Sequence, residues 1–191
     1  MPKYILPLGV LLLLASCTGP GTENVSTERL TQFVDPFIGT DYHGHTFPGA
    51  AWPFGQVQLS PDNGTQGWDW CSGYHYSDSV IAGFSHLHLS GTGIGDLADI
   101  SFLPVASEVN FIEGEENANF VSRYSARFKH SGESAEPGYY SVTLNNGIKA
   151  EFTVTQRTGF HRYSYPENAT TGAEPPDTDH NVHQFTRRFM R

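Results

Sequence analysis

The residues best suited to chemistry lie between positions 35 and 104. All three tryptophans, Trp52, Trp68 and Trp70, occur there, with five of the nine histidines and glycines at 91, 93 and 95. Lysine and arginine are scarce in this stretch. Indole faces stack on the C–H face of a sugar ring, while imidazoles and closely approaching backbone groups bind hydroxyls. The mixture indicates a neutral, hydroxyl-rich, ring-shaped ligand such as a sugar.

The first constellation is GWDWCSGYHYSD at residues 67–78. If this stretch is extended, Trp68 and Trp70 share one face and Asp69 lies on the other. The alternative is that the tryptophans fill the core of the domain. Two tryptophans flanking an aspartate, with His75 close by, are hard to bury without unpaired polar groups, which favours the wall of a pocket.

The second constellation is FSHLHLSGTGIGD at residues 84–96. A strand here places His86 and His88 on one face, where they could ligate zinc with Asp96, although no third histidine follows at a fixed spacing. The preferred interpretation is a ledge of hydrogen-bonding imidazoles, with glycines that admit close backbone approach. The glycine spacing differs from a dinucleotide-binding fingerprint, and no helical pattern follows. A third segment, GTDYHGHTFPGA at 39–50, is rich in histidine, and its role stays open.

These residues must be positioned by a scaffold, and the frequency of turn-forming residues along the chain is typical of β-structure. The 20 glycines and 12 prolines argue for many turns. Alternation predicts strands at 56–59, 84–89, 99–105, 140–144, 148–154 and 160–165, with turns at 60–64 and 145–147. Residues 27–33 predict one short helical turn, and residues 110–134 an exposed, charge-mixed loop-and-strand region. We therefore expect an all-β fold, an antiparallel β-sandwich.

The start of the chain has the character of a lipoprotein signal. Lys3 precedes an apolar run at 4–14, which is too short to span a membrane and ends in LASC with Cys17 at the expected cleavage point. The alternative is an ordinary secretory signal in which Cys17 is incidental. The expected organisation is a signal peptide at 1–17, a flexible tether at 18–30, the sandwich domain at 31–167 and an unstructured tail at 168–191.

Charge and cysteine content exclude several classes of protein. The net charge is −9 and no basic stripe occurs, so nucleic acid is not an expected partner. With Cys17 lipidated, only Cys71 of the two cysteines remains. No internal disulfide is then possible, a clustered-cysteine zinc site is excluded, and Cys71 is expected to be a small buried side chain.

Taken together, the motifs resemble the N-terminal domain of glycoside hydrolase family 92, the calcium-dependent exo-acting α-mannosidases. The resemblance extends from about residue 34 to 166. It is carried by VDPFIGT (34–40), HGHTFPGA (43–50), PFGQVQLSPD (53–62), GWDWCSGYHYSD (67–78), FSHLHLSGTGIGD (84–96), AEPGYYSVTL (135–144) and TGFHRYSYP (158–166).

The resemblance implies a two-domain enzyme, with an N-terminal β-sandwich and a larger C-terminal (α/α)6 barrel. Such enzymes invert the anomeric centre with one carboxylic acid and one carboxylate, assisted by calcium. The family's catalytic pair and main calcium ligands lie in the barrel, so this chain is expected to supply no catalytic residue and no metal site. By analogy, the expected ligand contacts are Trp68, Trp70, Tyr74, His86, His88, Ser90 and Thr92, with Gly91 and Gly93 shaping the loop and His45 and Asp41 as further candidates.

The leading hypothesis is therefore the glycan-contacting N-terminal part of an α-1,2-mannosidase-like enzyme, inactive alone because the barrel is missing. The tail at 168–191 is interpreted as a possible out-of-frame sequence. The alternatives are a stand-alone carbohydrate-binding lipoprotein and an inactive gene remnant. The expected partners are mannose-containing glycans, the missing barrel and, through lipid on Cys17, the outer membrane of a bacterial cell envelope.

Overall fold

The computed structural model describes residues 28–64, 67–91, 93 and 98–167. The predicted signal peptide with Cys17, most of the tether and the predicted tail lie outside these residues. Within the described ranges, no helix has the length and apolar character needed to cross a membrane. A short 3-10 helix, η1 (Leu30–Phe33), occurs where one helical turn was predicted.

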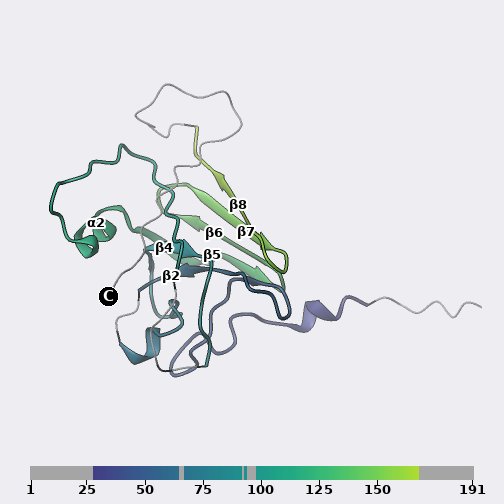
Figure 1. Ribbon diagram of the computed structural model, residues 1–191. Helices are drawn as coiled ribbons and strands as arrows, with labels where there is room; N and C mark the ends of the chain where they lie inside the picture. The colour runs from purple at the N-terminus through teal and green to yellow at the C-terminus, as the bar shows by residue number, and fades with distance from the viewer. Residues whose placement is uncertain (1–27, 65–66, 92, 94–97, 168–191) are drawn as a thin grey trace, which may run out of the picture. The chain divides into compact units, whose positions relative to one another are not determined.

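Two antiparallel sheets form the domain (Figure 1). The five-stranded sheet has the order β3-β5-β6-β7-β8 and the three-stranded sheet the order β1-β2-β4. The strands are β1 (Ala50–Ala51), β2 (Gln58–Asp62), β3 (Val80–Ile81), β4 (Gly83–Ser85), β5 (Ala126–Glu136), β6 (Tyr139–Leu144), β7 (Lys149–Val154) and β8 (Gly159–Ser164).

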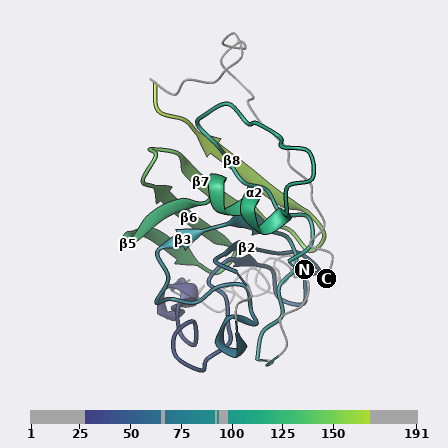
Figure 2. The same cartoon turned by 90° about the vertical axis from the view of Figure 1, so that its left-hand side faces the viewer.

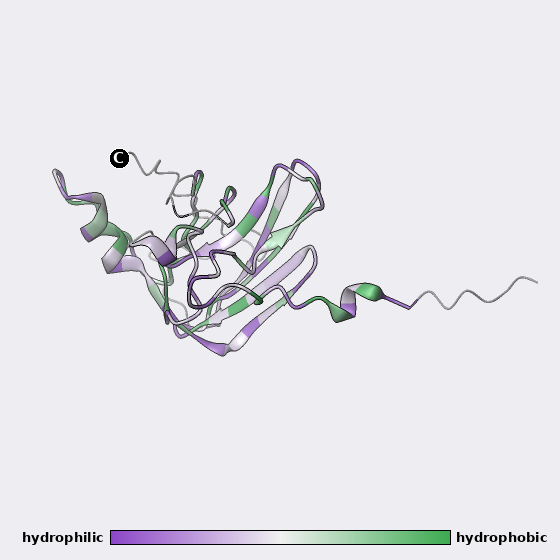
Figure 3. Cartoon of the chain, turned by 90° about the horizontal axis from the view of Figure 1, so that it is seen from below, coloured by the Kyte–Doolittle hydropathy of each residue, from purple (hydrophilic) through white to green (hydrophobic). Residues whose placement is uncertain are grey.

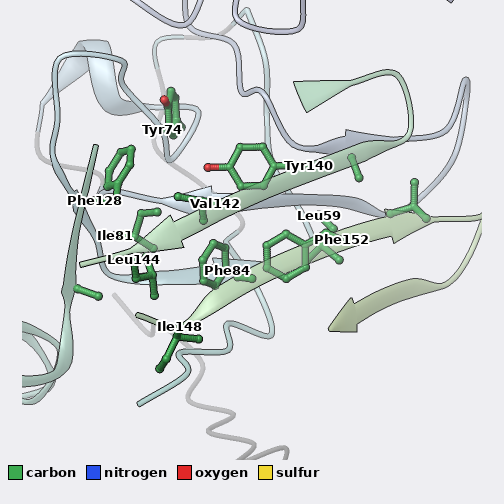
Figure 4. Packing of buried hydrophobic residues seen from close by; sticks show 14 residues of the cluster. Leu59, Tyr74, Ile81, Phe84, Phe128, Tyr140, Val142, Leu144, Ile148 and Phe152 are labelled. Carbon is green, nitrogen blue, oxygen red and sulfur yellow. The ribbon is translucent and has the colours of Figure 1, made fainter. Parts of the chain in front are cut away.

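The core lies between the two sheets. Leu59 of β2 and Phe84 of β4 pack against Tyr140, Val142 and Phe152 of the larger sheet (Figure 4). All five side chains are fully buried or nearly so. Their removal from water is the main favourable term in folding. The predicted antiparallel β-sandwich is confirmed.

The hairpin β6–β7 forms as its sequence dictates. Tyr140 pairs with Phe152 and Val142 with Ala150, so that alternate residues enter the core. Gly147 turns the chain with a φ of 87°, a left-handed conformation that glycine adopts without strain. The alternation of hydrophilic and hydrophobic colour along the strands is visible in Figure 3.

The predicted turn at 60–64 is wrong in its first half, because β2 continues through Pro61 to Asp62. Proline lacks an N–H donor and normally interrupts a sheet. Here Pro61 pairs with Phe84, whose own N–H and C=O bond to Phe102 on the opposite side. That position of the ladder needs no N–H from Pro61, and β1 has already ended on the other side of β2.

Two further predicted strands are shorter than expected. The strand at 84–89 ends at Ser85, and the strand at 99–105 is reduced to a single bridge between Phe84 and Phe102. In the predicted loop-and-strand region at 110–134, the strand β5 begins at Ala126, but the structure also has a helix that was not predicted, α2 (Asn117–Tyr124), drawn in front of the sheets in Figure 2. Outside the core, Phe111 stacks on Phe120 at 5.5 Å, and Arg123 pairs with Glu115.

A buried carboxylate occupies the irregular part of β5. The register of β5 against β6 shifts between Phe128 and Glu133. The Glu133 side chain is 1% exposed and accepts hydrogen bonds from Tyr74 Oη (3.1 Å), Tyr140 Oη (2.5 Å) and His130 Nδ1 (2.6 Å). Burial, followed by the nearby Glu133, raises the pKa of both tyrosines. The hydroxyls therefore stay protonated and act as donors.

Candidate functional site

Three segments that are distant in sequence meet around Trp68, in the short 3-10 helix η2 (Trp68–Trp70). The indole is 57% exposed. The ring of His45 stands edge-on to it at 4.2 Å, and the ring of His43 lies at 5.4 Å. A Cβ on Gly93 would lie 1.9 Å from Trp68 Nε1, so any side chain there would displace the indole from its present position. We call His43, His45, Trp68, Asp69 and Gly93 the Trp68 cluster.

Asp69 supplies the charge of this cluster. Its Oδ1 accepts hydrogen bonds from His43 Nδ1 at 2.6 Å and from His45 Nε2 at 3.3 Å. The bond from His43 is the largest influence on the Asp69 pKa, which lies below its ordinary value although partial burial opposes the shift. Asp69 is therefore a carboxylate at neutral pH, beside an accessible indole face. A carboxylate acceptor next to an aromatic face suits a polyhydroxylated ring.

The predicted shared face of Trp68 and Trp70 is wrong, because η2 is helical and not extended. Trp70 turns away from the Trp68 cluster and stacks on the buried His75, with ring centroids 4.3 Å apart. Its Nε1 donates to Asp78 Oδ2 at 2.5 Å. Trp70 therefore anchors the segment that carries Trp68, with its polar atom already satisfied.

Two other predicted ligand contacts lie in the interior. Tyr74 is 1% exposed, within the core, and bonds to Glu133. His88 is 3% exposed and bonds to Asp62. Because neither side chain reaches the surface, the predicted direct contacts of Tyr74 and His88 are wrong, and both residues instead support the structure around the site.

The remaining predicted residues are distributed around the cluster. His45 is nearly buried but touches Trp68, and its carbonyl accepts from the Gly91 N–H at 2.7 Å. Ser90, Gly91 and Gly93 are exposed. The exposed Asp41 lies beside His75, with 4.0 Å between its Oδ1 and the His75 Nε2. Thr92 lies outside the described residues. The sequence prediction did not include His43 or Asp69 among the ligand contacts.

His86 is held by a second histidine rather than facing a ligand. Its Nδ1 donates to the Ile100 carbonyl at 3.0 Å, which leaves Nε2 as an acceptor, 3.1 Å from His161 Nε2. His161 Nδ1 then accepts from Tyr163 Oη at 2.8 Å. The His161 ring is neutral in this chain of hydrogen bonds. Burial, and secondarily His86, lowers the pKa of His161 to about 4.

This histidine pair predicts a specific loss of stability in acid. The unfolded chain binds a proton at His161 below about pH 6.5, whereas the folded chain resists protonation until about pH 4. Stability should therefore fall as the pH falls from 6.5 towards 4, by at most about 3 kcal/mol from this residue. Urea unfolding of the wild type and of His161→Gln across this pH range gives the free energy of unfolding of each protein. The advantage of the wild type over the variant should shrink towards pH 4. A constant difference would contradict it.

Among the described residues, no group of three or more histidine, cysteine, aspartate or glutamate side chains is arranged to hold a metal ion. Cys71 is buried, as expected of a small apolar side chain.

Known proteins share this sequence and fold. Residues 33–184 match the family described as the glycosyl hydrolase family 92 N-terminal domain. An uncharacterized secreted glycosidase of Arthroderma benhamiae is 30% identical over 169 residues, which are 86% of this chain and 20% of that protein. The chain thus spans about a fifth of that curated relative.

Solved structures agree. A family GH92 α-mannosidase from Bacteroides thetaiotaomicron, in complex with mannoimidazole, is 45% identical with a TM-score of 0.66, over 73% of this chain and 18% of that one. A family GH92 inverting mannosidase from Bacteroides thetaiotaomicron VPI-5482 is 29% identical with a TM-score of 0.57, over 72% of this chain and 18% of that one.

Proposed function

Because the chain belongs to glycosyl hydrolase family 92 and carries its N-terminal domain, we propose that the Trp68 cluster binds a mannose residue of a glycan. The observation that carries this proposal is the exposed Trp68 indole beside the Asp69 carboxylate, with His43 and His45 bonded to that carboxylate. The indole would stack on the sugar ring while Asp69 accepts from its hydroxyls. Two similar proteins of known structure are described as mannosidases, which favours mannose among the sugars.

The hydrolytic activity of the whole protein belongs to the same proposal. Inversion requires an acid and a base about 6.5–9.5 Å apart, on opposite faces of the sugar. In the Trp68 cluster, Asp69 is the one carboxyl group and is committed to two histidines. The domain would therefore bind and orient the glycan, while the acid, the base and calcium would be held by a barrel domain. Isolated, it would bind without cleaving.

Attachment to the cell envelope through lipid on Cys17 is also part of the proposal. It rests on the LASC sequence, with the cysteine at the expected cleavage point. The secreted glycosidase of Arthroderma benhamiae supports a location outside the cytoplasm. A surface location would give the domain access to external glycans.

Titration of the purified chain with methyl α-mannoside tests the binding function. NMR signals of the tryptophan indole N–H groups report on the site directly, with methyl α-glucoside as the control sugar. We expect saturable shifts of the Trp68 signal with millimolar affinity and no hydrolysis of aryl α-mannosides, with or without calcium. The absence of any Trp68 shift at saturating mannoside would refute the proposal, and hydrolysis would refute the assignment of the carboxylates to a barrel.

A further inference from the structure

A buried pair of polar side chains, Asp62 and His88, lies beneath the proposed site. The pair is connected to two of the loops that form the site. Asp62, at the end of β2, and His88 have side chains that are 7% and 1% exposed. Asp62 Oδ1 lies 2.9 Å from His88 Nε2 and accepts from Ser85 Oγ at 2.9 Å. His88 Nδ1 donates to the Gln58 carbonyl at 2.8 Å. Both ring nitrogens of His88, Asp62 Oδ1 and Ser85 Oγ therefore each have a hydrogen-bond partner inside the domain.

The first loop of the site is attached through His88. The chain continues from His88 to Gly91, whose N–H bonds to the His45 carbonyl at 2.7 Å, and to Gly93, which lies against the Trp68 indole. A shift of His88 would thus displace the backbone against which Trp68 and His45 are placed.

The second loop is attached through the residue next to Asp62. The N–H of Asn63 bonds to the Gly73 carbonyl at 2.6 Å, and its Oδ1 accepts from the His75 N–H at 2.8 Å. Gly73 itself lies on the buried pair. A Cβ there would be 3.1 Å from Asp62 Oδ1 and 3.1 Å from His88 Cδ2. The segment that leaves η2 is therefore fixed directly to the same pair.

Although serine, histidine and aspartate are all present, this is not a catalytic triad. In a triad, the serine and the aspartate contact different nitrogens of the histidine ring. Here Ser85 and Asp62 both approach Nε2, at 3.2 Å and 2.9 Å, and Nδ1 is bonded to a carbonyl. Ser85 is also fully buried, so no substrate reaches it.

We infer that Asp62 and His88 are positioning residues, which lock both loops of the Trp68 cluster into the geometry that binds the sugar. This rests on the proposed function for the identity of the ligand. The locking itself is a property of the domain. A pair with only a general stabilising role would protect the whole sandwich equally, whereas a lock protects the two loops selectively.

Hydrogen exchange of the whole chain tests the lock, with Asp62→Asn and His88→Gln as variants of nearly unchanged volume. Amide exchange in residues 63–76 and 85–91 should accelerate about tenfold or more, equivalent to about 1.4 kcal/mol. Exchange in the β6–β7 hairpin should stay unchanged. If Asp62→Asn does not fold, His88→Gln, which removes the same contact from the other side, should give this pattern by itself. Glu151→Gln, which weakens the ion pair between Glu151 of β7 and Arg162 of the edge strand β8, is the control and should leave both loops unchanged.

Equal acceleration in the hairpin and the loops, or none in the loops, would overturn the inference. Methyl α-mannoside binding is measured on the same samples. It should be weaker in those variants whose loops exchange faster. If the wild type binds no mannoside, the proposed function fails, and the exchange data still decide whether Asp62 and His88 lock the loops.

Discussion

Replacing Trp68 with alanine should weaken methyl α-mannoside binding about tenfold or more while leaving the fold almost unchanged. The indole is more than half exposed, and substitutions at such positions usually change stability by less than about 0.5 kcal/mol. Loss of a stacking face that contributes about 1.4 kcal/mol gives a tenfold change in affinity. Calorimetric or NMR titration, with thermal unfolding measured in parallel, checks both halves of this expectation.

Trp52 provides the matched control. It is 54% exposed and lies in a different turn, Trp52 to Gly55, which is closed by a backbone hydrogen bond of 2.8 Å. Trp52→Ala removes the same amount of aromatic surface and should leave mannoside binding intact. Equal weakening by the two substitutions would mean that general aromatic exposure, and not the Trp68 cluster, accounts for binding.

The largest loss of stability is expected from Glu133→Ala. This substitution removes the acceptor shared by Tyr74, Tyr140 and His130, and leaves two buried hydroxyls without a partner. Each unsatisfied buried donor costs about 1–3 kcal/mol, so a total of about 3 kcal/mol is a moderate expectation. For a domain of this size, the melting temperature should fall by about 10 °C.

A double substitution separates the effect of the hydrogen bonds on stability from the effect of the packing. Tyr74→Phe combined with Glu133→Leu removes one donor together with the acceptor and should recover part of the lost stability, because of the two buried hydroxyls only that of Tyr140 is then left without its partner. Differential scanning calorimetry of the single and double variants gives the coupling free energy. Simple additivity would show that the carboxylate does not act through Tyr74.

The hairpin and the sandwich were predictable because their signals are local. In β6 and β7, an alternating pattern and a glycine turn specify both the register and the buried face. The ends of β2 and β4 could not be predicted, because they depend on pairing with a residue that is distant in the sequence. The backbone N–H and C=O of Phe84 bond to Phe102, on the side away from β2. Pro61 can therefore pair with Phe84 in the strand without donating an N–H.

At the site, the sequence indicated the correct stretch but not the orientation of its side chains. Side chains two residues apart on a strand point in the same direction, whereas in a 3-10 helix their directions differ by about 120°. This difference separates Trp68 from Trp70. The pairing of His43 with Asp69 spans 26 positions, and His86 meets His161 across 75. Spacing in one sequence contains no signal for contacts of that range.

The larger sheet ends at β8, which has no further strand beside it within the described residues. Such an edge offers backbone donors and acceptors to a strand from another molecule. Phe160, which is 53% exposed, adds an apolar side chain to this edge, while Arg162, bonded to Glu151 on β7, adds a charge that opposes stacking. In concentrated preparations of the domain, β8 therefore offers one edge at which strands of two folded molecules can pair without prior unfolding.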